Sequence, residues 1–379
     1  MTIGILKEPV PETRVSLLPE GAASLTKQNV AVQIEKTAGD SASAFDDAYV
    51  AQKCAVLERS AVLQSDIILA MHSLPDTDTA QLKPNAILIG MYQPLFNYEM
   101  MKQWAEKNIS TFSLDMMPRT TRAQAMDVLS SQANIAGYKA VLHAANIYPR
   151  YLPMFMTAAG SITPAKILIL GAGVAGLQAV ATARRLGAIV QVFDTRPAVK
   201  EEVMSLGAKF IEVEGAADAS KAGGYAVEQT EEYKQKQQQK INEAISKADI
   251  VITTAQIPGK KAPILISDEM LNAMKPGSVI MDLAAATGGN TLQTKNNQVT
   301  SYNHVTIVGN SDLAATMPGD ASKLYGKNVL NFLQLLLTKE GTIHLNFDDD
   351  LVRGCCITHD GKVMNEKVRQ LIGSDSWLL

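Results

Sequence analysis

The segment Lys166-Ile-Leu-Ile-Leu-Gly-Ala-Gly-Val-Ala-Gly176 decides the fold. Its first five residues form the apolar run of a buried strand, and its last six have the pattern G-x-G-x-x-G. A helical run, Leu177–Leu186, comes next, and a second strand, Val190–Phe193, ends at Asp194. A glycine turn between strand and helix, with an acidic residue roughly 20 positions further on, is the context that a dinucleotide fingerprint requires.

Each glycine of this turn has a physical reason. Gly171 permits the tight turn, Gly173 lets the backbone approach a pyrophosphate, and Gly176 allows the helix to pack closely on the strand. The helix N-terminus offers N–H groups to the phosphates. We expect Asp194 to bind the adenosine ribose and to repel a 2′-phosphate, which favours NAD over NADP, although Arg196 weakens that preference. The alternative is a glycine turn without a ligand.

Strands alternate with helices or loops from Lys166 to Asn310, which is the pattern of a Rossmann-type doubly wound sheet. Within this region, Glu228–Lys247 is polar and without breakers, and it predicts a solvated helix. The expected strands are Lys166–Leu170, Ile189–Phe193, Lys209–Val213, Ile250–Thr253, Ser278–Asp282 and Thr306–Val308.

The first third of the chain repeats this alternation without a glycine fingerprint, so we expect a second parallel sheet and no second cofactor. Arg122–Ile147 predicts one or two helices that lead out of this region. The C-terminal tail has no core of its own, and we expect a hairpin of Thr342–Phe347 and Leu351–Thr358 that packs back on the first domain. The expected strands of the first third are Thr2–Leu6, Val30–Ile34, Asp66–Ala70, Ala86–Met91 and Ser110–Leu114.

These patterns predict an α/β fold of two Rossmann-like domains with parallel sheets and a cleft between them. The N-terminal domain is discontinuous, with residues 1–135 completed by 320–379. The NAD-binding domain comprises residues 136–319.

The composition excludes several classes of protein. Of the 379 residues 46% are hydrophobic, and a net charge of -3 gives no reason to expect nucleic acid as a partner. The three cysteines, Cys54, Cys355 and Cys356, include no C-x-x-C pair, so we expect no metal site and a reducing compartment. No apolar stretch reaches the roughly 20 residues of a membrane span, so we expect no direct membrane insertion.

Several segments together resemble the NAD(H)-binding domain I of the alpha subunit of proton-translocating NAD(P) transhydrogenase. The resemblance covers nearly the whole chain, and the run from Pro118 to Asp127 is its most discriminating part. The segments are Glu12–Val15, Met117–Asp127, Ser131–Tyr138, Met156–Gly160, Phe193–Pro197, Gly223–Ala226 and Thr253–Gly259.

The resemblance implies a catalytic set of Arg119, Gln124 and Asp127, on a loop that reaches the nicotinamide end of NAD in that family, with Ser130 nearby. A Gln amide can both donate to and accept from the carboxamide, and an Arg can hold a phosphate or orient the ring. The alternative for Arg119–Asp127 is an ordinary ion pair at the start of a helix.

The resemblance also implies further nucleotide contacts. Gly224 and Tyr225 match a loop that closes over the bound nucleotide, for which a plain turn is the alternative. At Gln256 related sequences carry an aliphatic residue. The other implied positions are Val174, Thr195, Arg196 and Gln237.

The function that the resemblance implies is a Re/Si-specific transhydrogenase subunit that is active only with its partners. A hydride passes between NAD(H) on this chain and NADP(H) on a partner subunit, coupled to proton movement across the membrane. Transfer between two nicotinamides requires positioning and not a general base. The resemblance further implies a homodimer on the cytoplasmic, inner face of the membrane, held there by NADP(H)-binding and membrane-spanning subunits.

Two other functions stay open. Alanine dehydrogenase shares the architecture, but Ile67–Pro75 lacks the Lys and Leu88–Pro94 lacks the His that serve its acid–base chemistry. Arg14 could still hold a carboxylate and His72 could replace a missing base, although a structural hydrogen bond is the alternative for each. A non-catalytic NAD-binding sensor would carry the same fingerprint.

Overall fold

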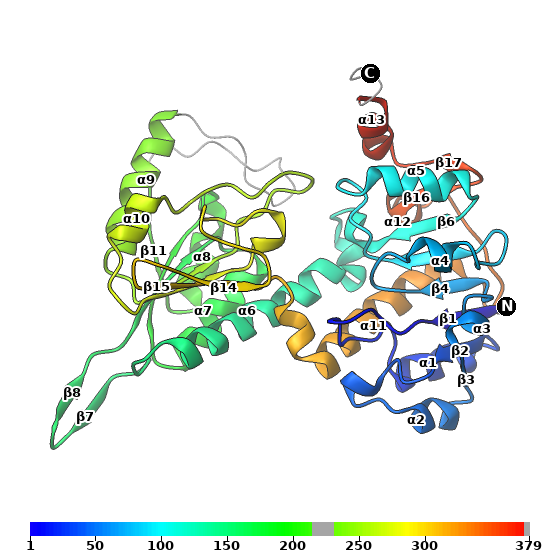
Figure 1. The fold of residues 1–379 in the computed structure, drawn as a ribbon, viewed down its shortest axis with the longest axis horizontal. Helices are drawn as coiled ribbons and strands as arrows, with labels where there is room; N and C mark the ends of the chain where they lie inside the picture. Colours follow the sequence, from blue (N-terminus) through cyan, green and yellow to red (C-terminus); the bar gives the residue numbers. More distant parts are fainter. Residues whose placement is uncertain (214–230, 375–379) are drawn as a thin grey trace. The chain divides into compact units, whose positions relative to one another are not determined.

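The computed structural model describes residues 1–213 and 231–374 (Figure 1). The chain divides into two compact units. Unit 1 comprises Met1–Gln132 and the described chain from Ala315 onward, and unit 2 comprises Ala133–Ala314. Each unit contains a mostly parallel sheet with helices on its faces, which confirms the predicted α/β class.

The sheet of unit 2 has seven strands in the order β11-β10-β9-β12-β13-β15-β14. Neighbours are parallel except for the pair β14–β15. The chain winds from β9 to one side through β10 and to the other through β12, so β9 lies at the topological switch point where such sheets bind ligands. The strands are β9 (Lys166–Leu170), β10 (Ile189–Phe193), β11 (Lys209–Phe210), β12 (Ile250–Thr253), β13 (Val279–Asp282), β14 (Gln298–Tyr302) and β15 (Val305–Gly309).

Alternate side chains of β9 pack into two different cores. Ile167 and Ile169 pack with the helices α6 (Val128–Ile147) and α7 (Val174–Arg185) on one face of the sheet. Leu168 and Leu170 pack with α9 (Glu231–Ile245) and α10 (Asp268–Asn272) on the other face. Burial on both faces explains why β9 is apolar at every position after Lys166.

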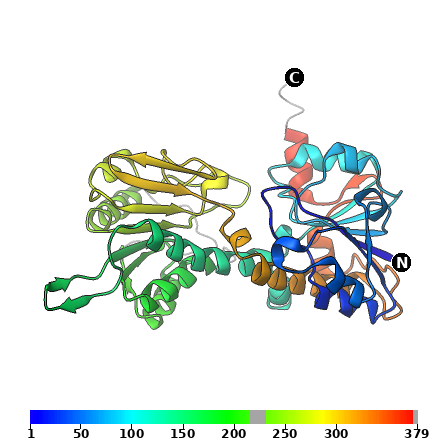
Figure 2. The same ribbon diagram turned by 60° about the horizontal axis from the view of Figure 1, so that its bottom comes forward.

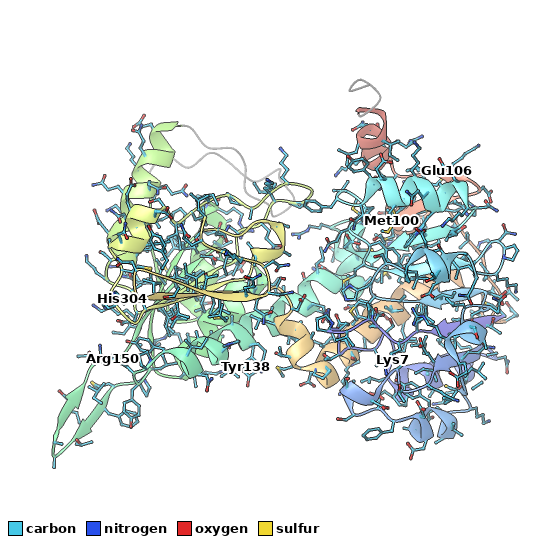
Figure 3. All side chains as sticks on the ribbon, in the orientation of Figure 1. Lys7, Met100, Glu106, Tyr138, Arg150 and His304 are labelled. Carbon is cyan, nitrogen blue, oxygen red and sulfur yellow. The ribbon has the colours of Figure 1, made fainter. Side chains whose placement is uncertain are left out.

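A short hairpin of β7 (Phe155–Thr157) and β8 (Gly160–Ile162) extends away from the rest of unit 2 (Figures 1 and 2). Arg150 lies near its base (Figure 3). Its apolar side chains are exposed: Met156 is 75% and Met154 63% accessible. The sequence patterns predict no element at this position.

The sheet of unit 1 has eight strands in the order β17-β16-β6-β5-β4-β1-β2-β3. The strands β1 to β6 are parallel, and β16, from the C-terminal tail, pairs antiparallel with β6. The tail therefore completes the sheet of the first unit. The strands are β1 (Thr2–Ile5), β2 (Ala31–Glu35), β3 (Ala55–Leu57), β4 (Ile67–Leu69), β5 (Ile87–Gly90), β6 (Ser110–Ser113), β16 (Cys356–His359) and β17 (Lys362–Val363).

Helices cover both faces of this sheet. Side chains from α1 and α11 pack on one face with Ile3 and Ile5, whereas α5 packs on the other face with Ile68 and Leu88. The helices of unit 1 are α1 (Pro19–Thr26), α2 (Asp46–Ala51), α3 (Arg59–Val62), α4 (Asp76–Thr79), α5 (Tyr98–Glu106), α11 (Pro318–Leu336), α12 (Asp350–Cys355) and α13 (Glu366–Ser374), and unit 2 adds α8 (Lys200–Ser205).

The hairpin predicted for Thr342–Phe347 and Leu351–Thr358 is wrong. Asp349 begins a helix instead, because its carboxylate accepts hydrogen bonds from the backbone N–H groups of Leu351 (2.9 Å) and Val352 (3.4 Å). The strand β16 begins only at Cys356 and pairs with β17.

In the part of the chain that the structure describes, no helix combines the length and the apolar character that crossing a bilayer would require.

Candidate nucleotide-binding site

The glycine turn between β9 and α7 has the geometry that its sequence predicts. Gly171 has a φ of +107°, and a Cβ on it would lie 2.3 Å from Thr254 Oγ1. A Cβ on Gly176 would lie 1.9 Å from the carbonyl oxygen of Gly171. The fold itself therefore requires both glycines.

Gly173 differs from its two neighbours in the motif. A Cβ added to Gly173 would meet nothing within 4 Å, and the residue has an ordinary extended backbone with φ −75°. The protein thus gives no internal reason for a glycine at this position. A ligand that must approach the backbone closely is such a reason, and a pyrophosphate fits it.

The N-terminus of α7 follows directly. Gly173 is the N-cap of this 12-residue helix, and within the described residues no side chain caps it. The first N–H groups of the helix and the positive end of its dipole can therefore serve an anion. Val174, at the first turn, is 40% exposed.

Asp194 follows β10, next to the glycine turn. Its side chain is 6% exposed, and its Oδ2 accepts a hydrogen bond of 2.7 Å from the backbone N–H of Ala172. Arg196 forms an ion pair with the same carboxylate, and this pairing raises the pKa of the guanidinium. Thr195 is half-buried between them. The structure thus brings the predicted ribose residues together with the phosphate turn.

The other residues predicted in unit 2 lie at different places. Gln256 is exposed on the loop after β12, and its Nε2 donates to the carbonyl oxygen of Leu283, after β13 (2.9 Å). Gln237 is half-buried on α9. Gly224 and Tyr225 lie outside the described residues.

The residues predicted to act at the nicotinamide lie in unit 1, on and around a 3-10 helix, η3 (Thr121–Met126). Ala123 and Met126 are buried, whereas Gln124 is exposed. The carbonyl oxygen of Ala125 accepts hydrogen bonds from Nδ2 of two asparagines of α11, Asn328 (2.8 Å) and Asn331 (2.9 Å). The backbone on both sides of Gln124 is therefore fixed to the core of unit 1 while its amide faces outward.

Two further contacts hold this loop. Arg122 pairs with Asp349 (Nη1–Oδ2 2.7 Å) and Asp350 (Nη2–Oδ1 2.6 Å) at the start of α12. Pro118 packs against Gly354, where a Cβ would lie 2.4 Å from the proline ring. The exposed Arg119 follows this proline.

Asp127 is the helix cap of α6. Its Oδ1 accepts from the backbone N–H of Ser130 (2.9 Å) and its Oδ2 from the Ser130 hydroxyl (2.7 Å). The two predicted residues therefore contact each other, and Asp127 fixes the end of the loop to the start of a 20-residue helix.

A buried ionic cluster in unit 1 contains Arg14 and His72. The Arg14 guanidinium donates to both oxygens of Glu12, from Nε (2.8 Å) and Nη2 (2.6 Å), and to Gln132 Oε1 (2.8 Å). His72 Nε2 lies 2.8 Å from Glu12 Oε2. Burial opposes ionisation of Glu12, but the hydrogen bonds from Arg14 and His72 outweigh it and hold its pKa below the usual range. Arg14 and His72 thus have the structural partners that were their alternative.

Glu8 borders this cluster and was not identified from the sequence. Its carboxylate accepts from the backbone N–H groups of Met71 (2.5 Å) and His72 (3.1 Å) after β4. Burial raises the pKa of Glu8 to about 7.

Among the described residues no group of three or more His, Cys, Asp or Glu side chains is placed to hold a metal ion. Cys54, Cys355 and Cys356 are buried free thiols.

Two family models match the chain: the alanine dehydrogenase/PNT N-terminal domain over residues 4–136 and the C-terminal domain over residues 140–366. The chain is 45% identical over 377 residues to the first portion of NAD(P) transhydrogenase subunit alpha from Rickettsia prowazekii, across 98% of each chain. The crystal structure of transhydrogenase from Sinorhizobium meliloti superposes with a TM-score of 0.88 and 43% identity, across 96% of this chain and 100% of that one. Alanine dehydrogenase of Mycolicibacterium smegmatis is 25% identical, across 94% of this chain and 92% of its own.

Proposed function

Since the chain belongs to the alanine dehydrogenase/PNT family, we propose that it is the NAD(H)-binding subunit of a proton-translocating NAD(P) transhydrogenase. The identity to transhydrogenase alpha subunits, 45% against 25% for the alanine dehydrogenase, favours this member of the family. The observation that carries the proposal is Gly173: it is a glycine that the protein does not need for its own packing, at the capless N-terminus of α7.

NAD(H) supplies the hydride-carrying ring, and the chain's own residues hold it. The backbone around Gly173 and the start of α7 bind the pyrophosphate, and Asp194 binds the adenosine ribose. Arg119, Gln124 and Asp127 act at the nicotinamide end. Gln124 orients the carboxamide, because its amide offers both a donor and an acceptor. Asp127 acts through Ser130 and α6, by fixing the end of the loop that carries Gln124.

This arrangement requires no general acid or base. Hydride transfer between nicotinamides releases no proton at the reacting carbon, so the chain contributes orientation and exclusion of water. An exposed glutamine on a loop fixed by buried residues suits that task. The second ring, of NADP(H), belongs to a partner subunit, and the transfer is Re/Si-specific and coupled to proton movement only in the assembled enzyme.

The runner-up, an amino acid dehydrogenase, is opposed by the cluster in unit 1. Arg14 would have to bind the substrate carboxylate, yet Glu12 already neutralises it through two hydrogen bonds. A substrate carboxylate would lose this competition unless the buried Glu12 were displaced, and a buried charge without its partner is costly.

A homodimer is proposed from the β7–β8 hairpin. Tyr151, Met154, Phe155 and Met156 are large apolar side chains, all more than 40% exposed on one projecting element. Such a patch marks a protein contact. A second copy of the chain is the partner that we propose, and Met156→Asp should shift the molecule from dimer to monomer in analytical ultracentrifugation. A dimer that persists in this variant contradicts the assignment.

The location follows from the assembly. We propose that the chain lies on the cytoplasmic, inner face of the membrane and is held there through membrane-spanning partner subunits.

The experiment that tests the function is reduction of an NAD analogue by NADPH, measured with the NADP(H)-binding partner subunit present and absent. We expect exchange only with the partner present. Exchange by the chain alone, or rapid NADH formation from alanine, contradicts the proposal.

A further inference from the structure

The carboxylate of Asp194 already accepts four hydrogen bonds. Its Oδ1 accepts from the backbone N–H (2.8 Å) and Nε (2.9 Å) of Arg196, and its Oδ2 accepts from the backbone N–H of Ala172 (2.7 Å) and Nη2 of Arg196 (2.7 Å). An ionised carboxylate has about four acceptor positions. All of them are used, so a ribose hydroxyl must replace one of the present donors.

Two of these four donors can be replaced and two cannot. The N–H of Ala172 belongs to the glycine turn, and the N–H of Arg196 belongs to the backbone that follows β10, so both are fixed by the fold. Nε and Nη2 belong to a side chain that can change rotamer. The Arg196 guanidinium therefore occupies the acceptor positions that a ribose would need.

The pair also changes the electrostatics of the site. An isolated Asp repels a 2′-phosphate, but Arg196 compensates that charge with a fork in which two nitrogens bind the carboxylate. A guanidinium that leaves Asp194 stays beside the ribose, and its planar donors match phosphate oxygens.

We propose that Arg196 is a specificity-determining residue of the ribose subsite. It competes with the adenosine ribose for Asp194, and its charge reduces the discrimination against dinucleotides that carry a 2′-phosphate. This inference rests on the proposed NAD(H) site.

The test is the ratio of the dissociation constants of NADPH and NADH, measured by isothermal titration calorimetry on the full chain. In Arg196→Leu we expect this ratio to rise at least fivefold, with NADH bound at least as tightly as by the wild type. In Asp194→Asn we expect the ratio to fall. Arg185→Leu is the matched control, because it removes the same charge from an exposed position at the other end of α7 and should leave the ratio unchanged.

A second variant keeps the proposal testable if Arg196→Leu does not fold. Arg196→Lys keeps the charge but cannot form the two-nitrogen fork, so NADH should bind more tightly while the ratio rises less than in Arg196→Leu. A ratio in Arg196→Leu that stays within twofold of the wild type, or falls, overturns the role of Arg196 while leaving the NAD(H) site intact. A wild-type chain that binds neither dinucleotide overturns the site itself.

Discussion

Replacing Gly173 by alanine separates the needs of the fold from those of the ligand. In the ligand-free protein the new methyl group meets nothing within 4 Å, and the backbone (φ −75°, ψ −172°) suits alanine. At such a position Gly→Ala stabilises a protein by about 0.4–1 kcal/mol, because it restricts the unfolded chain. We therefore expect the free energy of unfolding in urea to stay constant or to rise slightly.

The same methyl group would stand between the backbone and the pyrophosphate. Loss of one hydrogen bond to a charged phosphate corresponds to about 1.5–3 kcal/mol, which is roughly a 10- to 100-fold increase in the dissociation constant of NADH. NADH fluorescence titration measures this change. Gly373→Ala, on α13, also meets nothing within 4 Å and is the matched control that should alter neither quantity.

Gly176→Ala should behave in the opposite way. Its Cβ would lie 1.9 Å from a backbone oxygen, so this variant should lose stability before any ligand is added. If Gly173→Ala bound NADH as tightly as the wild type, the assignment of this turn to a pyrophosphate would be refuted.

Three further predictions concern unit 1. Gln124→Ala should slow hydride exchange at least tenfold while the NADH dissociation constant changes less than threefold, and an equal loss of both in stopped-flow and titration experiments would exclude a positioning role. Asp127→Ala removes the cap of α6 and should lower the free energy of unfolding by about 1 kcal/mol in urea, whereas Asp127→Asn should retain most of it. Burial raises the pKa of Glu8 from 4.5 to about 7, so its contribution to stability is complete below about pH 4.5 and is lost as the pH rises through 7; urea unfolding at pH 5 and pH 8 should show a smaller loss in Glu8→Gln, and an unchanged loss would assign it to other groups.

Buried parallel strands are the part of this fold that the sequence predicts best. The bounds of β9, β10 and β12 agree with their apolar runs, because a strand buried on both faces is apolar throughout and ends where the loop begins. Strands at the edge carry less information. The missed strand β14 reads Gln-Val-Thr-Ser-Tyr, and the signal that could have identified it is the turn at Asn303 and His304, both with positive φ, that joins it to β15.

Helix α12 shows how a local contact overrides composition. Leu351–Thr358 contains the β-branched and aliphatic residues of a strand, but the cap at Asp349 and the ion pairs of Arg122 favour a helical turn at its start. A single sequence does not show that Asp349 lies next to a residue more than 200 positions away.

The candidate site divides along the same line. The G-x-G-x-x-G pattern specifies its own geometry, so the roles of Gly171 and Gly176 follow from spacing alone. The partners of charged side chains do not follow from spacing. Arg14 and Arg196 each pair with an acidic residue two positions earlier, and only the structure shows that these carboxylates are thereby occupied.

The central claim, that this chain presents one nicotinamide for hydride exchange with a second, is tested most directly by isotope transfer. NADH carrying deuterium at the reactive position of C4 would be incubated with NADP⁺, the chain and its NADP(H)-binding partner. We predict that the deuterium appears in NADPH without dilution by solvent hydrogen, and only when both proteins are present. Deuterium transferred by this chain alone to pyruvate and ammonia, to give labelled alanine, would contradict the account.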